Sequence, residues 1–112
     1  MALRHASPGE VVDLLPAERT LGKTAAIVKS GTFEAVRLVV LAGVEIPSHR
    51  VDGAVTLQCL SGRTVIGFEN QEVEIGAGQW LYLEGGTPHW LRGIDDSVIM
   101  LTILFSAHED LV

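Results

Sequence analysis

Short runs of β-branched and aliphatic residues, separated by glycine-containing turns, recur along most of this chain and constrain its fold more than any other feature. After an opening segment the runs are TAAIVKSGTF, EAVRLVVLAG, AVTLQCLSG, RTVIGF, EVEIGAG, QWLYLEGG, HWLRG and SVIMLTILF. The glycines fall between the runs, where turns need positive φ angles. About eight short strands with turn signals every 8 to 12 residues predict an all-β sandwich or barrel.

The two ends of the chain differ from this pattern. The opening segment, to about residue 20, contains GEVVDLLP, for which we expect a short helical turn or an irregular structure ended by Pro16. The last run, residues 97–105, is apolar on both of its alternating faces. Such a strand is expected to be buried on both sides, either between sheets or at a dimer contact.

Length and composition exclude several classes of protein. A chain of 112 residues suits one domain with one core. A net charge of −6 and eight dispersed basic residues argue against nucleic acid as a partner. No apolar run approaches the roughly 18 residues of a membrane span, and no signal peptide is visible. Because Cys59 is the single cysteine, no internal disulfide can form, and we expect a cytoplasmic protein.

Two segments carry a recognisable motif. In GVEIPSHRVDGAVTLQCLSG, residues 43–62, a glycine precedes His49 by six positions and Gly62 closes the stretch. In residues 78–93, Gly78 stands before the phrase LYLEGGTPHWLRG, which contains Gly86 and, three positions later, His89. Taken in order and with this spacing, the two segments resemble the two conserved motifs of the cupins. The resemblance implies an RmlC-like double-stranded β-helix, or jelly-roll barrel, spanning residues 1–112 and commonly forming a homodimer.

The resemblance also implies a set of metal ligands, and here the chain departs from the family. Metal-binding cupins generally use two histidines and a glutamate from the first motif and one histidine from the second. His49 and His89 match the first and the last of these ligands, whereas Val51 and Val55 occupy the other two positions.

Strand alternation gives an independent view of the first motif. Successive side chains of a strand point to opposite faces. If residues 49–60 are extended, one face carries His49, Val51, Gly53, Val55, Leu57 and Cys59. This face is apolar apart from the histidine, whereas the other face carries most of the polar groups, so the apolar face should line the barrel. A turn or bulge at Gly53 would shift the phase of the first half.

Two imidazoles in an apolar pocket supply no negative charge, so this pair alone is a poor site for iron, nickel, zinc or manganese. Cys59, on the same face, could add a thiolate, although a small buried apolar residue is the alternative interpretation. Glu84, at the end of a strand, could add a carboxylate, although a solvated strand-end carboxylate is the alternative interpretation. The aromatic residues Trp80, Tyr82 and Trp90 could form a wall for a planar ligand or pack between sheets or subunits.

Three functions follow from these observations. The first is binding of a hydrophobic or aromatic small molecule with one polar or acidic end. His49 and His89 would anchor it, and the other lining residues would be Val51, Val55, Leu57, Cys59 and Glu84. The second is a divalent-metal-dependent enzyme, of dioxygenase or isomerase type, that uses the two histidines with a reduced ligand set. The third is a structural dimeric barrel without a ligand. The sequence leaves catalytic activity open.

Overall fold

The computed structural model describes residues 5–15 and 24–105. Its strands are β1 (Ala25–Lys29), β2 (Phe33–Val40), β3 (Glu45–His49), β4 (Val55–Ser61), β5 (Arg63–Phe68), β6 (Gln71–Gly76), β7 (Trp80–Leu83), β8 (His89–Gly93) and β9 (Ser97–Leu104). The predicted all-β class is therefore confirmed. Within the described residues, no helix is long and apolar enough to cross a membrane.

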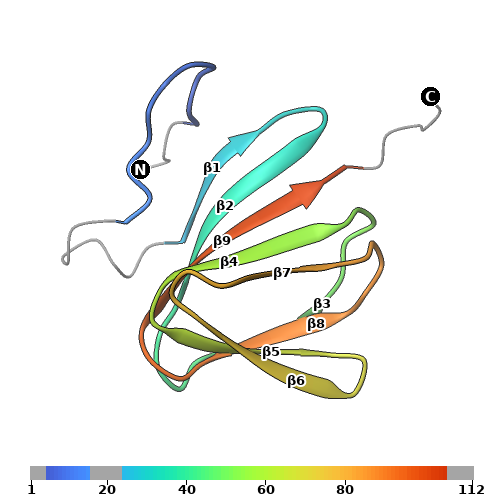
Figure 1. Cartoon of the computed structure of the whole chain (residues 1–112). Helices are drawn as coiled ribbons and strands as arrows, with labels where there is room; N and C mark the ends of the chain where they lie inside the picture. Colours follow the sequence, from blue (N-terminus) through green and yellow to red (C-terminus); the bar gives the residue numbers. More distant parts are fainter. Residues whose placement is uncertain (1–4, 16–23, 106–112) are drawn as a thin grey trace.

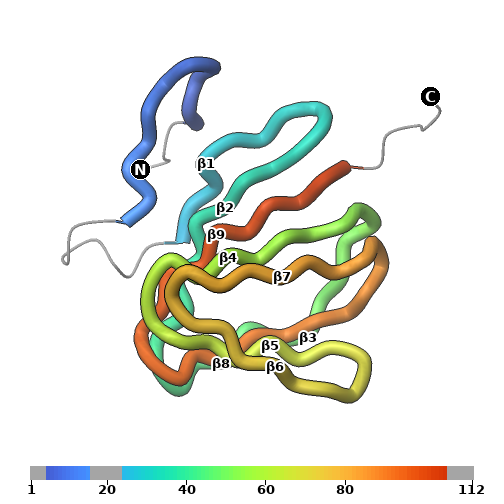
Figure 2. The backbone as a smooth tube through the Cα atoms, in the orientation of Figure 1, coloured from blue at the N-terminus to red at the C-terminus, as the bar shows by residue number. Residues whose placement is uncertain are grey.

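The strands form two antiparallel sheets that face each other (Figure 1). The five-stranded sheet has the order β1-β2-β9-β4-β7, and the four-stranded sheet has the order β3-β8-β5-β6. The β2–β3, β4–β5, β6–β7 and β8–β9 connections cross between the sheets at one end, whereas the β3–β4 and β7–β8 loops cross at the other (Figure 2). The sheets thus enclose a single interior with two different ends.

The core fills the space between the sheets. Cross-strand partners on the inner face of the five-stranded sheet include Leu57 with Leu101 and Cys59 with Ile99. From the other sheet Ile66 and Leu91, also partners, meet them. These side chains are at most 8% exposed, as expected for alternating apolar positions on two facing sheets.

The last apolar run of the sequence, residues 97–105, contains β9, and the position of β9 accounts for its two apolar faces. It lies between β2 and β4 near the middle of the five-stranded sheet, so its backbone is paired along both sides. Ile99 and Leu101 point into the core, while Val98, on the opposite face, is also fully buried. The expectation of burial on both faces holds for the first half of the strand and weakens toward Leu104, which is 45% exposed.

One strand was absent from the sequence-based expectation, and the N-terminal segment takes one of its two expected forms. β3 was not among the predicted runs, because EIPSH contains a proline and mostly exposed side chains. It is an edge strand, where the missing N–H of Pro47 is tolerated. Of the helical turn and the irregular structure expected for GEVVDLLP, the structure has the irregular form over residues 9–15, after a turn at residues 8–9. Pro16, expected to end it, lies outside the described residues.

Candidate ligand site at the histidine pair

The two motif histidines are brought together by the pairing of β3 with β8. His49 ends β3, His89 begins β8, and the two residues are cross-strand partners. Partners in an antiparallel pair point to the same face. The imidazole centroids lie 4.6 Å apart with an angle of 53° between the ring planes.

The two loops at this end of the barrel hold the pair in place. Residues 50–54 follow His49, and residues 84–88 precede His89. The Gly86 N–H donates to the Val51 carbonyl oxygen at 2.7 Å, which ties one loop to the other. The loops also touch at Gly85, where a Cβ would lie 2.0 Å from the Asp52 carbonyl oxygen. Only glycine permits this approach, so the sequence GG before His89 serves the contact between the loops.

Hydrogen bonds to the backbone fix how the imidazoles present their nitrogens. His49 Nδ1 lies 3.2 Å from the Pro47 carbonyl oxygen, and His89 Nδ1 lies 3.0 Å from the Thr87 carbonyl oxygen. Because a carbonyl oxygen can only accept, each Nδ1 must carry the proton. In the neutral state each Nε2 then keeps its lone pair, which can accept a hydrogen bond or bind a cation.

The two imidazoles differ in their access to solvent. His89 is 2% exposed, whereas His49 is exposed. Desolvation lowers the pKa of His89 from its ordinary value of 6.5. The hydrogen bond to Thr87 opposes this shift, and the proximity of His49 adds a smaller lowering. With its pKa lowered, His89 is a neutral hydrogen-bond acceptor at pH 7.

Two further residues of the four-stranded sheet lie in line with the histidine pair, on the neighbouring strands. His89 pairs with Phe68 on β5, which pairs in turn with Gln71 on β6, so the four residues share the inner face. Phe68 is half-buried and packs against the core, which gives the pair an apolar neighbour. The sequence reasoning missed both residues. Alternation along RTVIGF could have placed Phe68 on the inner face, but only the sheet order places it beside His89.

The valines expected to line a pocket occupy two different settings. Val55 begins β4 and is 3% exposed within the core. Val51 lies outside any strand, is half-buried and packs against the core from the loop. The interior face predicted for residues 55–59 is thus the inner face of β4, whereas residues 50–54 form a loop and do not continue the alternation.

Leu57 and Cys59 are fully buried in the core. The Cys59 thiol donates to the carbonyl oxygens of Ser61 and Gly62, at 3.3 and 3.4 Å, near the end of the barrel opposite the histidines. Burial raises the pKa of this thiol, and the hydrogen bond to Ser61 only partly offsets the effect. Cys59 therefore behaves as a small buried side chain and is a poor thiolate ligand.

The donor set does not fit the ion that the cupin resemblance implies. Across residues 5–15 and 24–105, no group of three histidine, cysteine or acidic side chains is placed to hold a metal. Glu84 is exposed in the turn after β7, so neither it nor Cys59 joins the imidazoles as the metal hypothesis required. A pair of imidazoles without an anionic partner falls short of the usual three protein ligands.

A pocket of about 350 Å³ lies at the same end of the molecule as the loop 50–54. Its walls are mostly apolar, and its lining residues are Glu34, Val51, Asp52, Gly53, Ile103 and Phe105. Val51 is the only predicted site residue among them.

The three aromatic residues whose role the sequence left open point away from the interior of the barrel. Trp80 and Tyr82 lie on the outer face of the five-stranded sheet, and Trp90 lies on that of the four-stranded sheet beside Arg92.

Comparison with known proteins gives the fold its name. No protein-family profile matches the sequence, and no curated relative matches at a significant level. Many solved structures do match. A conserved protein of unknown function from Streptococcus pyogenes is 18% identical over 96% of both chains, with a TM-score of 0.76.

Two further structures carry the fold name in their descriptions. A cupin superfamily protein from Desulfitobacterium hafniense is 16% identical over 87% of this chain and 100% of its own, with a TM-score of 0.72. An RmlC-like cupin from Desulfovibrio desulfuricans is 21% identical over 91% of this chain and 96% of its own, with a TM-score of 0.68. The chain therefore has the RmlC-like cupin fold, a double-stranded β-helix, as the two motifs predicted. This likeness assigns no ligand and no reaction.

Proposed function

We propose that this chain binds a small, largely apolar molecule at the end of the barrel that carries the histidine pair. A polar group of the ligand donates a hydrogen bond to Nε2 of His49 or His89. The observation that supports this function most directly is the tautomer of the pair. Both Nδ1 atoms lie within hydrogen-bond distance of backbone carbonyl oxygens, so both Nε2 lone pairs are left for a ligand.

The chemistry of the pair selects the kind of ligand. A neutral imidazole with a free Nε2 accepts a hydrogen bond from a hydroxyl or N–H group, whereas an anion would require protonation of the ring. Because desolvation and the neighbouring imidazole both lower the pKa of His89, protonating it at pH 7 is unfavourable. We therefore expect an uncharged hydroxyl compound to bind more tightly than the carboxylate of the same size. Phe68 and Val51, both half-buried, offer apolar contact.

Thermal unfolding in the presence of four probes tests this proposal: phenol, cyclohexanol, benzoate and hexanoate. A ligand that binds the native state raises the melting temperature in a concentration-dependent way. Phenol or cyclohexanol should stabilise the wild-type chain at millimolar concentration and about pH 7.5, and the two carboxylates should do so less. Stabilisation by none of the four, or equally by all, contradicts the proposal.

Matched variants locate the effect. In His49→Asn and His89→Asn the amide N–H can replace Nδ1–H as a donor to the backbone carbonyl, while the Nε2 lone pair is lost. Both variants should keep their fold and lose the stabilisation by the hydroxyl probes. His5→Asn, at an exposed position in the N-terminal segment, is the control and should respond like the wild type. A response retained in both site variants places the ligand elsewhere.

The same variants separate this proposal from the metal-dependent alternative. Iron, nickel, zinc or manganese bound stoichiometrically to untagged protein, and lost in both asparagine variants, would favour the metal. The donor set described above does not favour it.

A further inference from the structure

One carboxylate of the five-stranded sheet points into the barrel. Glu34, on β2, is the cross-strand partner of Ile103 on β9, and Ile103 is in turn the partner of Val55 on β4. Partners in antiparallel strands point to the same face, and both Val55 and Ile103 belong to the core or pack against it. The side chain of Glu34 therefore lies on the inner face, where it is half-buried.

This carboxylate lies at the end of the barrel that carries the histidine pair. Residues 50–54 connect His49 to Val55, and residues 84–88 connect Leu83, the partner of Val55, to His89. Each loop thus joins the row of residues that begins with Glu34 to the row that carries the imidazoles. The two rows belong to sheets that face each other (Figure 1).

The pocket of about 350 Å³ described above lies beside this carboxylate and is here called the Glu34 pocket. Val51, Ile103 and Phe105 give it apolar walls. Val51 follows His49 by two positions and packs against the core from the loop. The Glu34 pocket therefore shares an apolar wall residue with the proposed ligand site.

The charged groups of the Glu34 pocket are acidic. Glu34 and Asp52 line it, and its described lining residues include no lysine, arginine or histidine. Lys29 is the cross-strand partner of Glu34 on β1, but within the described residues no ion pair joins the two side chains. A half-buried carboxylate in this state favours a ligand that brings a positive charge, and the net charge of −6 adds to the attraction.

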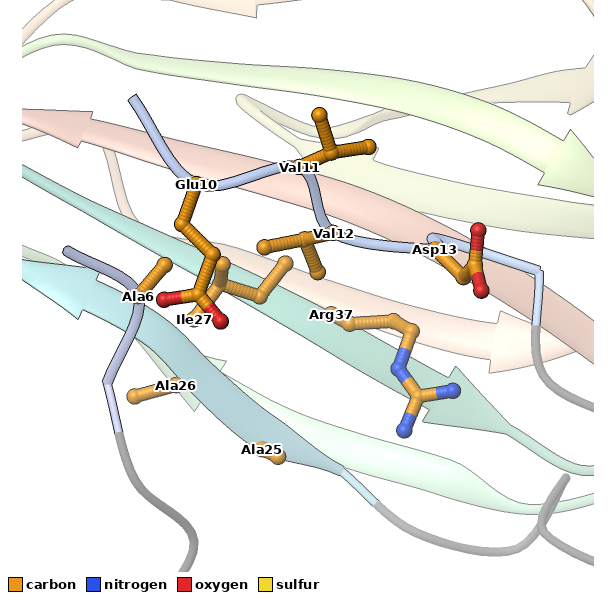
Figure 3. Close-up of a pocket in the computed structure, with 9 residues that line it drawn as sticks. All are labelled: Ala6, Glu10, Val11, Val12, Asp13, Ala25, Ala26, Ile27 and Arg37. Carbon is orange, nitrogen blue, oxygen red and sulfur yellow. The ribbon is translucent and has the colours of Figure 1, made fainter. Parts of the chain in front are cut away.

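A second pocket, under the N-terminal segment, provides a contrast. It has a volume of about 290 Å³ and lies between that segment and the strands β1 and β2 (Figure 3). Its lining also includes two carboxylates, from Glu10 and Asp13, but the guanidinium of Arg37 belongs to the same lining (Figure 3). A cation of the chain itself offsets the acidic groups there, whereas in the Glu34 pocket this role is left to a ligand.

We propose that the ligand of this protein carries a protonated amine as well as a hydroxyl group. This inference rests on the function proposed above, in which the hydroxyl donates to Nε2 of His49 or His89. The ammonium group donates to the carboxylate of Glu34, and the apolar part of the ligand lies against Val51 and Ile103. Glu34 thus selects a cationic compound over a neutral one, a choice that two neutral imidazoles do not make.

An organic ammonium group suits this site better than a metal ion. A divalent ion usually takes at least three protein ligands, and residues 5–15 and 24–105 contain no group of three histidine, cysteine or acidic side chains placed to hold one. An ammonium group is satisfied by one or two acceptors. The apolar part attached to it also uses the apolar walls, which a metal ion does not.

Calorimetric titration of the full chain with three related compounds tests the inference. The compound 4-ethylphenol has the hydroxyl group alone, 2-phenylethylamine has the amine alone, and tyramine has both on the same ring and chain. Alkyl amines are protonated at about pH 7.5. Tyramine should bind the wild type about fivefold or more tightly than either of the others. Its advantage over 4-ethylphenol should shrink in about 0.5 M salt, which screens the ion pair.

Two glutamine variants locate the charge that is responsible. Glu34→Gln keeps the size of the side chain and removes its charge, so the ratio of the tyramine and 4-ethylphenol affinities should fall to about one. Glu45→Gln is the matched control, because Glu45 is an exposed carboxylate at the start of β3, next to the inward-facing Ile46 and therefore on the outer face. This variant should keep the wild-type ratio. Circular dichroism verifies that both variants are folded.

The titrations distinguish failure of this inference from failure of the proposed function. When 4-ethylphenol binds the wild type and this binding is lost in His49→Asn and His89→Asn, the hydroxyl site stands on its own. Tyramine that then binds no more tightly than 4-ethylphenol, or no more tightly than 2-phenylethylamine, overturns the inference alone. An advantage of tyramine that Glu34→Gln retains does so as well. Failure of 4-ethylphenol to bind overturns both.

Discussion

Thr64 is fully buried on the inner face of β5, and within the described residues its hydroxyl oxygen has no hydrogen-bond partner. Ser97, another fully buried hydroxyl residue, is satisfied by the carbonyl oxygens of Arg63 and Asp95, at 2.9 and 2.7 Å. An unpaired buried hydroxyl costs free energy, because folding removes it from water without replacing the lost hydrogen bond. Of the two buried hydroxyl groups, the one on Ser97 is hydrogen-bonded and the one on Thr64 is unpaired.

Thr64→Val should therefore stabilise the chain. Valine has the same branched shape without the oxygen, so the variant removes the unpaired group and leaves no cavity. We expect the free energy of unfolding, measured by urea denaturation, to rise by about 1 kcal/mol. Thr56→Val, on the outer face of β4, is the control and should change stability by less than about 0.5 kcal/mol. A loss of stability in Thr64→Val would mean that the hydroxyl has a partner.

The histidine pair is the other feature decided at single residues. The spacing of the two motifs identified His49 and His89 as candidates, and the structure brings their rings together. The same spacing places Val51 and Val55 at the two positions where metal-binding cupins have their other ligands. Whether any of these residues binds a ligand stays a prediction.

At the scale of the elements, the loop 50–54 matters most, because it connects β3 to β4 at the end of the barrel that carries the histidines. The Leu104 N–H donates to the Ala54 carbonyl oxygen at 2.9 Å, so the loop is fastened to the end of β9. A Cβ at Gly53 would lie 1.5 Å from the Leu104 carbonyl oxygen. Loop and strand are thus packed backbone against backbone, and any side chain at this position must push them apart.

Gly53→Ala should accordingly destabilise the chain by more than about 2 kcal/mol, since the clash is with a backbone atom that cannot rotate away. Thermal unfolding or urea denaturation measures the effect. Gly31→Ala is the matched control. In the turn between β1 and β2, its Cβ would meet nothing within 4 Å, so stability should be nearly unchanged. Equal stability of the two variants would contradict the close approach at Gly53.

At the scale of the whole molecule, burial of His89 makes stability depend on pH. The pKa of this histidine is lower in the folded chain than its ordinary value of 6.5, because desolvation disfavours the charged ring. Between the folded pKa and 6.5 the unfolded chain therefore binds more protons than the folded chain. The contribution of neutral His89 to the free energy of unfolding is therefore complete above pH 6.5, the unfolded pKa. It is lost as the pH falls from 6.5 toward the folded pKa.

We expect the free energy of unfolding of the wild type to fall between about pH 7.5 and about pH 5.5. His89→Asn removes the titrating group, so its stability should fall less over this interval. His5→Asn changes an exposed histidine and should show the full wild-type decrease. Urea denaturation at the two pH values measures all three proteins. A decrease in His89→Asn as large as in the wild type would show that another group is responsible.

The sequence by itself determined the β class and the cupin fold, since turn glycines, period-two alternation and motif spacing are local properties that tertiary packing did not override. It also determined that β4 buries Val55, Leu57 and Cys59. It could not reveal β3, whose proline and exposed residues look like a loop until β8 pairs with them. Nor could it place Phe68 beside His89 or turn Trp80 and Tyr82 outward.

Those features were decided by the tertiary structure, because they depend on sheet order and register. These bring together residues that are distant in the chain. The burial that results from this packing also lowers the pKa of His89. Alternation says which way a side chain points relative to its own strand, but only the neighbouring strands and loops determine what it meets there.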